Sequence, residues 1–398
     1  MNPQIEKLFQ TSQKPSRLII GLMSGTSMDG LDVALCKFHE AGQKTSVELL
    51  QFETVPFEED VKTEIRKVFA KQTIDFPLLC MLNPWIGNMH GEMVSTCLEK
   101  WCIKPSEIDA IASHGQTVMH QPKRLHGLEK YPNSTLQIGD GDHMAIKTGI
   151  LTLSDFRQKH CAAGGEGAPL ALYGDYLLFS SDLENRVLIN IGGIANFTFL
   201  PADGDFDKVF ATDSGPGNTI IDAYVQQHFN LPFDENAAIA KKGNLNESLL
   251  NKLKEHTYFK EQIPKTTGPE LFNLAYIDTL IENTLIEDIS HEDVLKTLCH
   301  FTADTLCDCI IQNVDINEKT GVYLSGGGMH NPLLVDLIKQ RLPNLVIDKM
   351  HVLGISGDAK EAVLFAALAN ETLSGETGFK KPNNELGSFY MGKISLPN

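Results

Sequence analysis

The chain has 398 residues and a formal net charge of −17, from 34 Lys and Arg against 51 Asp and Glu. A chain of this length with 42% hydrophobic residues exceeds one ordinary domain, so two domains are expected. The negative charge argues against a nucleic-acid or anionic-membrane surface, because such polyanions would be repelled. The partner expected instead is a small molecule.

The cysteines and the first residues point to the cytoplasm. Eight cysteines are scattered along the chain, without the paired CxxC spacing that holds zinc. The first residues are polar and mixed in charge, so they lack the apolar region of a secretory signal. No apolar run approaches membrane-spanning length. We therefore expect a cytoplasmic protein with reduced thiols.

In chain order, the first half reads as strands and helices. Two apolar strands are expected at residues 18–20 and 31–36, joined by the turn SGTSMDG, and a third at residues 46–54. Apolar residues then follow the helical period within residues 58–98. The next three expected strands end in SHGQT, in GDGD and before SDFR, and they cover residues 108–112, 135–138 and 150–153.

The second half repeats this plan. Its strands are expected at residues 187–191, 195–200, 208–212 and 321–324. Helices are expected over most of residues 245–313 and at residues 332–340. Both halves thus open on a strand hairpin that is followed by helices. The sequence predicts an α/β fold with an internal duplication, and we place the boundary near residue 151.

Three strands run into glycine-rich turns, SGTSMDG, NIGGIAN and SGGGMHN. Such turns expose backbone N–H groups at a strand end, where an anion can bind. One turn of this kind is more often only a tight turn. Three of them suggest a nucleotide phosphate tail held between two domains.

Acidic residues stand beside two of the expected strands. Asp29 and Asp32 follow the first glycine-rich turn, where they could hold Mg²⁺ or remain solvated acids. Asp213 follows an apolar strand and precedes Ser-Gly-Pro-Gly-Asn. That position suits an acid projecting into a cleft, and it suits a helix cap equally well.

Eight motifs together resemble one known family. SGTSMDGLD, SHGQT, LQIGD, DFR with GGEGAPL, NIGGIAN, DSGPGN, SGGGMHNPLL and GDAKEA occur in the order typical of the anhydro-N-acetylmuramic acid kinases, within the sugar kinase, Hsp70 and actin superfamily. The resemblance covers residues 18 to about 370. It implies two actin-like (ribonuclease H-like) domains with ATP in the cleft between them: residues 1–151 plus about 380–398, and residues 152–379.

The resemblance also implies which residues bind ATP. They are Gly25, Thr26, Ser27, Met28, Asp29, Gly30, Leu31, Asp32, Gly192, Gly193, Gly326, Gly327, Gly328 and Asn331. Asp29 and Asp32 would hold Mg²⁺, directly or through water. Asp213 matches the general base of the family. Glu361 matches a second acidic position near the nucleotide and metal, although a first-turn glutamate favoured by the helix dipole is as good an explanation of that residue.

The implied reaction couples two steps. A 1,6-anhydro sugar has no free hydroxyl at carbon 6, so its ring must open as the phosphoryl group is accepted. Asp213 would take a proton from a water that attacks the anomeric carbon, and the released O6 would attack the γ-phosphate of ATP. The products would be N-acetylmuramic acid 6-phosphate and ADP, as in peptidoglycan recycling and amino sugar catabolism.

The sugar would be held by a second set of residues. The candidates are His114, Gln116, Asp155, Arg157, Gly167, Ala168 and Pro169. The guanidinium of Arg157 suits the lactyl carboxylate that distinguishes muramic acid. The alternative is that Asp155 and Arg157 form a structural pair.

The chain departs from the family pattern at three positions. Glu166 replaces a Gln, His160 replaces an Asp, and Pro269 replaces an Arg. The gained acid and the lost Arg lower the positive potential for an anionic sugar. Two alternatives therefore stay open: a kinase of a neutral anhydro sugar such as levoglucosan, and an actin-like or Hsp70-like ATPase clamp without a sugar. Relatives of this kind are often dimers, so a homodimer is expected.

Overall fold

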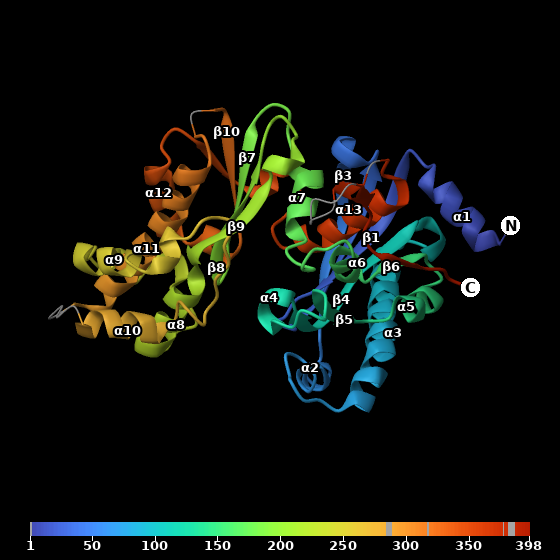
Figure 1. Cartoon of the computed structure of the whole chain (residues 1–398), viewed down its shortest axis with the longest axis horizontal. Helices are drawn as coiled ribbons and strands as arrows, with labels where there is room; N and C mark the ends of the chain where they lie inside the picture. Colours follow the sequence, from blue (N-terminus) through green and yellow to red (C-terminus); the bar gives the residue numbers. More distant parts are fainter. Residues whose placement is uncertain (1, 284–288, 317, 377, 381–386) are drawn as a thin grey trace. The chain divides into compact units, whose positions relative to one another are not determined.

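The computed structural model describes residues 2–283, 289–316, 318–376, 378–380 and 387–398. They form two compact units, Met1–Leu178 with Gly354–Asn398, and Phe179–Leu353 (Figure 1). The sequence had placed the boundaries near residues 151 and 380 instead. The difference arises because the segment after residue 151 pairs and packs with the first unit. Part of the expected C-terminal return, residues 381–386, lies outside the described residues.

The first unit is built on a sheet in the order β14-β6-β4-β1-β2-β3, with β5 paired to β4. Strands β1, β2 and β3 are antiparallel, whereas β4 and β6 run parallel to β1. The bounds are β1 (Ser16–Ser24), β2 (Gly30–His39), β3 (Ser46–Pro56), β4 (Ala110–Gln121), β5 (Ser134–Ile138), β6 (Thr152–Ser154) and β14 (Lys393–Ser395). A separate two-stranded ribbon joins β12 (Phe379–Lys380) to β13 (Ser388–Phe389).

The second unit repeats this topology with a five-stranded sheet, in the order β11-β10-β7-β8-β9. Its first three strands are again antiparallel, and the other two again run parallel to the first of them. The bounds are β7 (Asn185–Ile191), β8 (Ile194–Leu200), β9 (Phe210–Pro216), β10 (Thr320–Ser325) and β11 (Val346–Lys349). The same path in both units confirms the α/β class and the internal duplication.

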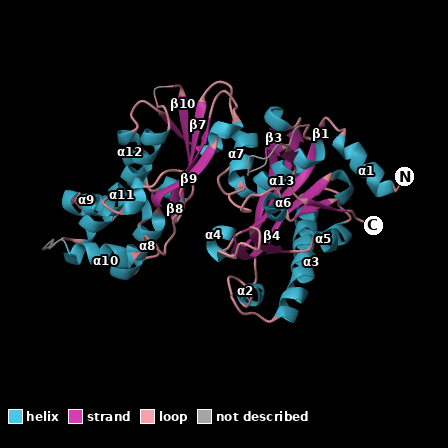
Figure 2. Cartoon of the chain, in the orientation of Figure 1, coloured by secondary structure: helices cyan, strands magenta, loops and turns pink. Residues whose placement is uncertain are grey.

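Helices accompany each sheet (Figure 2). In the first unit they are α1 (Pro3–Ser12), α2 (Glu59–Arg66), α3 (Phe76–Lys100), α4 (Lys123–His126), α5 (Gly141–Thr148), α6 (Phe156–Ala162), α7 (Ala171–Phe179, ending at the unit boundary) and α13 (Lys360–Ser374). In the second they are α8 (Asn218–Phe229), α9 (Glu247–Lys254), α10 (Leu274–Asn283), α11 (His291–Asn313) and α12 (Pro332–Arg341). No described helix is long and apolar enough to cross a bilayer.

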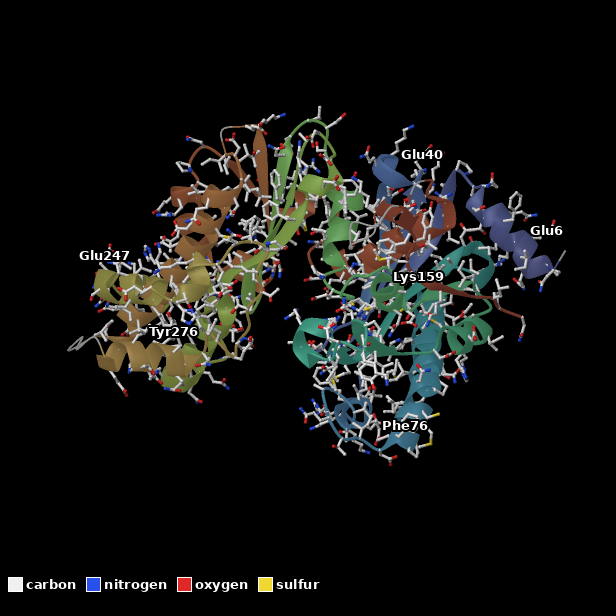
Figure 3. The ribbon with its side chains drawn as sticks, viewed as in Figure 1. Glu6, Glu40, Phe76, Lys159, Glu247 and Tyr276 are labelled. Carbon is white, nitrogen blue, oxygen red and sulfur yellow. The ribbon has the colours of Figure 1, made fainter. Side chains whose placement is uncertain are left out.

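The two sheets bury separate cores. In the first unit, Ile20, Leu22 and Leu35 pack with residues of α3 such as Ile86 and Val94. In the second unit, β7 and β10 pack against α8, α11 and α12. Figure 3 marks Glu247 and Tyr276 on the helices of this unit, where the Tyr276 hydroxyl donates to the Leu253 carbonyl at 2.7 Å and ties α10 to α9.

Two strands continue past the positions where the sequence predicted them to end. SHGQT lies inside β4 rather than after it, because β5 pairs with the second half of β4. Asp213 lies inside β9, because β8 stays paired with that strand as far as Pro216. The candidate site residues on these segments are therefore held by a sheet and not by a loop.

Helix α13 lies close against β1 in the first unit. A Cβ at Gly21 would lie 1.9 Å from the Ala362 carbonyl oxygen, so only glycine allows this approach. Because Ala362 follows Glu361 on α13, the contact also fixes the position of that acid.

We expect Gly21→Ala to destabilise the protein by about 3 kcal/mol, since backbone atoms would have to separate. Urea unfolding followed by far-UV circular dichroism measures the loss. An unchanged unfolding midpoint would show that α13 is not held by this contact.

Candidate active site

The first glycine-rich turn joins β1 to β2. Thr26, Ser27 and Asp29 are exposed, so their side chains and backbone are accessible to a ligand. The side chains of Met28 and Leu31 are buried, at 3% and 1% exposure, so these two residues could offer only backbone groups. Gly30 is required by the sheet, because a Cβ there would lie 2.4 Å from the Val55 carbonyl oxygen.

Acidic side chains gather behind this turn. The Asp32 Oδ1 accepts a hydrogen bond from the Thr54 hydroxyl at 2.6 Å. Burial raises the pKa of Asp32, the Thr54 bond opposes that rise, and the negative charges of Asp358 and Asp29 add to it. A cation would relieve this repulsion. Yet within the described ranges, no three His, Cys, Asp or Glu side chains meet closely enough to hold a metal directly. The donor set therefore fits a hydrated Mg²⁺ held through water.

The buried side chain of Gln116 is hydrogen-bonded to the first glycine-rich turn. Its Oε1 accepts a hydrogen bond from the Ser24 hydroxyl at 2.6 Å, and its Nε2 donates to the Gly25 carbonyl at 3.2 Å. The side chain is fully buried. This geometry differs from the direct sugar contact expected of Gln116, and makes it a brace of the turn.

Arg157 of α6 is fixed by two hydrogen bonds. Its Nε donates to the Nε2 atom of His114 at 2.8 Å, and its Nη1 donates to the Gly167 carbonyl at 2.7 Å. Within the described chain, the Nη2 atom of Arg157 makes no hydrogen bond, so it can donate to a ligand. Asp155 pairs with Lys393 and not with Arg157, so the structural pair considered from the sequence does not form.

His114 is neutral in this arrangement. Burial, together with the nearby charge of Arg157, lowers its pKa to about 3. Because a guanidinium only donates, Nε2 of His114 must accept, which assigns the ring proton to Nδ1, 2.8 Å from the Gly115 carbonyl. His114 therefore orients the Arg157 guanidinium as a neutral hydrogen-bond acceptor, so it does not neutralise the positive charge of Arg157.

The loop around Gly167 is tied to the same helix. The Gly167 N–H donates to Nδ1 of His160 at 2.9 Å, and Gly167 has φ +85°, which favours glycine. His160 is buried and its pKa is lowered by that burial to about 4, so it is a neutral acceptor here. Ala168 and Pro169 follow directly in this loop. His160, one of the three departures from the family pattern, thus holds this loop through its hydrogen bond to the Gly167 N–H.

Glu166 lies in this loop beside Arg124. The Arg124 Nε donates to a Glu166 carboxylate oxygen at 3.0 Å. The acid gained at this position is therefore compensated by a cation from α4. This pair offsets part of the loss of positive potential expected from the sequence.

We expect Glu166→Gln to change the free energy of unfolding by less than about 1 kcal/mol, since both side chains are partly exposed. Affinity for an anionic sugar should rise modestly, because Arg124 loses its counter-charge. Thermal unfolding and sugar KM measure the two effects. Glu129→Gln, which removes the exposed Lys123 pair, is the control. A large loss of stability would contradict the surface role.

Glu361 stands in the first turn of α13 and its side chain reaches solvent. Desolvation by the surrounding protein raises its pKa, while the charges of Arg157 and Lys360 oppose the rise and that of Asp32 adds to it. Arg157 and Asp32 are thus each close enough to influence the pKa of Glu361. The first unit brings these predicted residues together.

In the second unit, the β7–β8 hairpin is joined to the start of α8. The N–H groups of Gly217 and Asn218 donate to the Gly193 and Gly192 carbonyls at 2.9 and 2.8 Å. A Cβ at Gly193 would lie 2.4 Å from the Thr219 hydroxyl oxygen. Gly193 therefore allows the hairpin to pack on α8, whereas Gly192 remains more open.

The third glycine-rich turn follows β10. Gly326 has φ +79°, which favours glycine. A Cβ on Gly326 would lie 2.7 Å from the Ile191 carbonyl oxygen, and one on Gly328 would lie 2.3 Å from the Ile191 side chain. Both glycines therefore allow this turn to pack closely against β7. Asn331 caps α12 by accepting from the Leu334 N–H at 3.0 Å. Gly327 has the most space of the three glycines, with the Asn218 amide nitrogen 3.4 Å from such a Cβ. It is the best placed of them for a ligand to approach.

Asp213 is half-buried in β9. Its Oδ2 accepts a hydrogen bond from the Thr267 N–H at 2.9 Å, while Oδ1 makes none within the described ranges. Burial raises its pKa, and the Thr267 bond opposes that rise. Asp213 does not cap α8, whose N-cap is Gly217. The carboxylate is therefore oriented at one oxygen and free at the other.

Several supporting contacts were not identified from the sequence. Ser24, Arg124, Tyr258, Lys265 and Thr267 contact predicted site residues through hydrogen bonds or ion pairs. Thr267 lies 54 positions from Asp213, and Gln116 lies 92 from Ser24. No local pattern of the sequence signals such distant pairs.

The comparisons with known proteins agree with the motif order. A family model described as anhydro-N-acetylmuramic acid kinase matches residues 17–383. Proteins of that name from Pseudoalteromonas atlantica and Pseudoalteromonas translucida are 53% and 52% identical, over 100% of both chains in each case. One from Caldanaerobacter subterraneus is 39% identical over 98% of this chain and 100% of its own.

Solved structures match more distantly. The activator of the 2-hydroxyisocaproyl-CoA dehydratase from Clostridium difficile, with bound ADPNP, has a TM-score of 0.44 and 12% identity, covering 90% of this chain and 96% of its own. The family match over most of the chain and the full-length relatives carry the assignment. The chain therefore belongs to the anhydro-N-acetylmuramic acid kinase family.

Proposed function

We propose that this protein is a cytoplasmic, ATP-dependent kinase that opens 1,6-anhydro-N-acetylmuramic acid with water and phosphorylates O6. The products are N-acetylmuramic acid 6-phosphate and ADP, which places the reaction in peptidoglycan recycling. The observation that carries the proposal is the carboxylate of Asp213. One of its oxygens is held by the Thr267 N–H, the other is free, and burial raises its pKa.

Asp213 acts as the general base on water. The free Oδ1 takes one proton as the water oxygen bonds to the anomeric carbon, and the bond from that carbon to O6 breaks. O6 then takes the γ-phosphoryl group, and ADP leaves. A raised pKa makes Asp213 a stronger base than an ordinary aspartate, which suits proton removal from water.

Arg157 recognises the carboxylate of the sugar. The support for this role is its free Nη2 and the two bonds that fix the rest of the guanidinium to His114 and Gly167. An ionic hydrogen bond from a preorganised guanidinium gives both affinity and orientation. Glu361 shares this neighbourhood, and its raised pKa suits proton exchange with a sugar hydroxyl.

In the first unit, the exposed Thr26 and Ser27 would contact the phosphates of ATP. In the second unit, Gly327 has space for a ligand to approach its backbone. Asp29 and Asp32 would hold Mg²⁺ through water, and the ion supplies neutralisation of phosphate charge when bound. The hydroxyls and backbone N–H groups of the turn add neutral donors at the same place. Formation of a homodimer remains a prediction that size measurements in solution can test.

Sugar-dependent ADP release tests the function. The protein is incubated with Mg-ATP and either 1,6-anhydro-N-acetylmuramic acid, levoglucosan or no sugar. ADP and a 6-phosphorylated muramic acid should appear in equal amounts with the first sugar alone. ADP release at the same rate with and without sugar would instead identify an ATPase clamp. Release that requires levoglucosan would identify a kinase of neutral sugars.

A further inference from the structure

We propose that Lys265 and Tyr258 are positioning residues for the catalytic base, because they form a closed ring of hydrogen bonds with Asp213. The inference rests on the proposed function, in which Asp213 removes a proton from water. It concerns how the second unit holds that carboxylate. Neither residue touches the reacting atoms.

The ring has three hydrogen bonds. The Tyr258 hydroxyl donates to the Asp213 main-chain carbonyl at 2.9 Å. The Lys265 ammonium donates to the Tyr258 carbonyl at 2.8 Å. The Asp213 N–H donates to the Lys265 carbonyl at 3.0 Å and closes the ring. The segment that holds Tyr258 and Lys265, residues seven positions apart, is therefore locked around Asp213 of β9.

The ring reaches the carboxylate through the backbone. Thr267, two residues after Lys265, donates the N–H bond that holds Oδ2 of Asp213. The Lys265 N–H also donates to the Thr212 hydroxyl at 3.0 Å, so the start of this segment is bound to β9. Displacement of Lys265 would move the Thr267 N–H and release the carboxylate.

Burial of the Lys265 ammonium group is energetically unfavourable. Its side chain is 8% exposed, its Nζ lies 4.4 Å from the centre of the Tyr258 ring, and it makes no ion pair within the described parts of the chain. Burial lowers its pKa, and the neighbouring Cys309 and Glu261 oppose that shift. A buried cation without a paired carboxylate opposes folding. Its presence is explained better by the geometry of Asp213 than by stability.

A cavity leaves room for the loosened side chain to move. It has a volume of about 480 Å³ and is lined by Lys265, Ser214, Thr305, Cys309 and Lys260 among others. The cavity adjoins the segment that precedes Thr267, so this segment would have space to move if the Lys265 side chain were lost. Lys260 lines the same cavity but is exposed, so it makes a matched control.

The test compares Lys265→Met and Tyr258→Phe with Lys260→Met. For the first two we expect kcat to fall about tenfold with the KM for ATP unchanged, since small misplacements of a base are costly. The acid limb of the kcat profile should move to higher pH, because the Thr267 bond that lowers the pKa of Asp213 is weakened. The thermal midpoint of Lys265→Met should equal or exceed that of the wild type. Lys260→Met should match the wild type.

Two results would overturn the inference. One is a folded Lys265→Met with wild-type kcat and an unmoved acid limb. The other is a parallel loss of stability and activity with an unmoved acid limb, which is the mark of a merely structural residue. Carbon-13 NMR of the labelled aspartate carboxyls gives the pKa of Asp213 without turnover. An upward shift in Lys265→Met supports the ring even if the wild type phosphorylates no sugar, which would overturn only the proposed function.

Discussion

Replacing Asp213 with Asn is expected to lower turnover by about a hundredfold or more, as loss of a general base does. The amide oxygen of Asn can still accept the Thr267 N–H bond, so the backbone should keep its position. ATP affinity should therefore remain close to that of the wild type. Single-turnover phosphorylation gives the rate of the chemical step, and calorimetric titration gives the ATP affinity.

The same variant also separates activity from stability. Burial raises the pKa of Asp213, so the folded state favours its neutral form and holds the ionised carboxylate at a cost. That cost is present above the folded pKa and disappears as pH falls below the ordinary aspartate pKa, near 4. Asp213→Asn should therefore be at least as stable as the wild type at neutral pH. Asp182→Asn, an exposed acid of the same unit, is the control. Near-normal turnover in Asp213→Asn would remove this residue from the mechanism.

Replacing Arg157 with Ala is expected to raise the KM for 1,6-anhydro-N-acetylmuramic acid by about ten- to a hundredfold, the range of a lost ionic hydrogen bond. The affinity for levoglucosan should change little, because that sugar has no carboxylate. Initial rates over a range of each sugar concentration provide the comparison.

The Arg157 variant also carries a structural cost. The Gly167 carbonyl and His114 lose their partners, so stability should fall by about 1–3 kcal/mol. Arg66→Ala, which breaks an exposed pair with Glu59, controls for the loss of a surface cation. Equal losses with the two sugars would contradict the reading of the carboxylate by Arg157.

The duplicated fold was predictable because its signals are local. A strand that runs into a glycine-rich turn occurs in both halves, and the periodicity of the apolar residues separates strands from helices. The association of Asp213 with a strand was predictable for the same reason, although β9 continues past it to Pro216. The strand ends were less predictable, since β4 continues through His114 because β1 and β5 both pair with it beyond that residue. Pairing of distant strands leaves no mark in a short window of sequence.

The roles of individual site residues were predictable only in part. Gly30 and Gly328 were expected to bind ATP, and the structure shows that both are also required by close packing against Val55 and Ile191. Gln116 was expected at the sugar, yet it is buried under the first turn. A glycine or an amide can serve either purpose, and the choice depends on neighbours from other segments.

The charge near the sugar residues shows the same limit. Glu166 suggested a weaker site for an anion when the sequence was considered alone. Its partner Arg124 lies 42 positions earlier, and their pairing offsets part of that effect. Lys265 and Tyr258 likewise reach Asp213 from 52 and 45 positions away, through bonds that depend on the folded second unit.

Oxygen-18 water provides the most direct test of the central claim, that Asp213 makes water open the anhydro ring while O6 accepts phosphorus. The enzyme is incubated with Mg-ATP and 1,6-anhydro-N-acetylmuramic acid in labelled water, and the product is examined by mass spectrometry before its anomeric oxygen exchanges. One label at carbon 1, with an unlabelled phosphate at O6, is the predicted result. A label in the phosphate, or a phosphorylated sugar whose anhydro ring is intact, would contradict it.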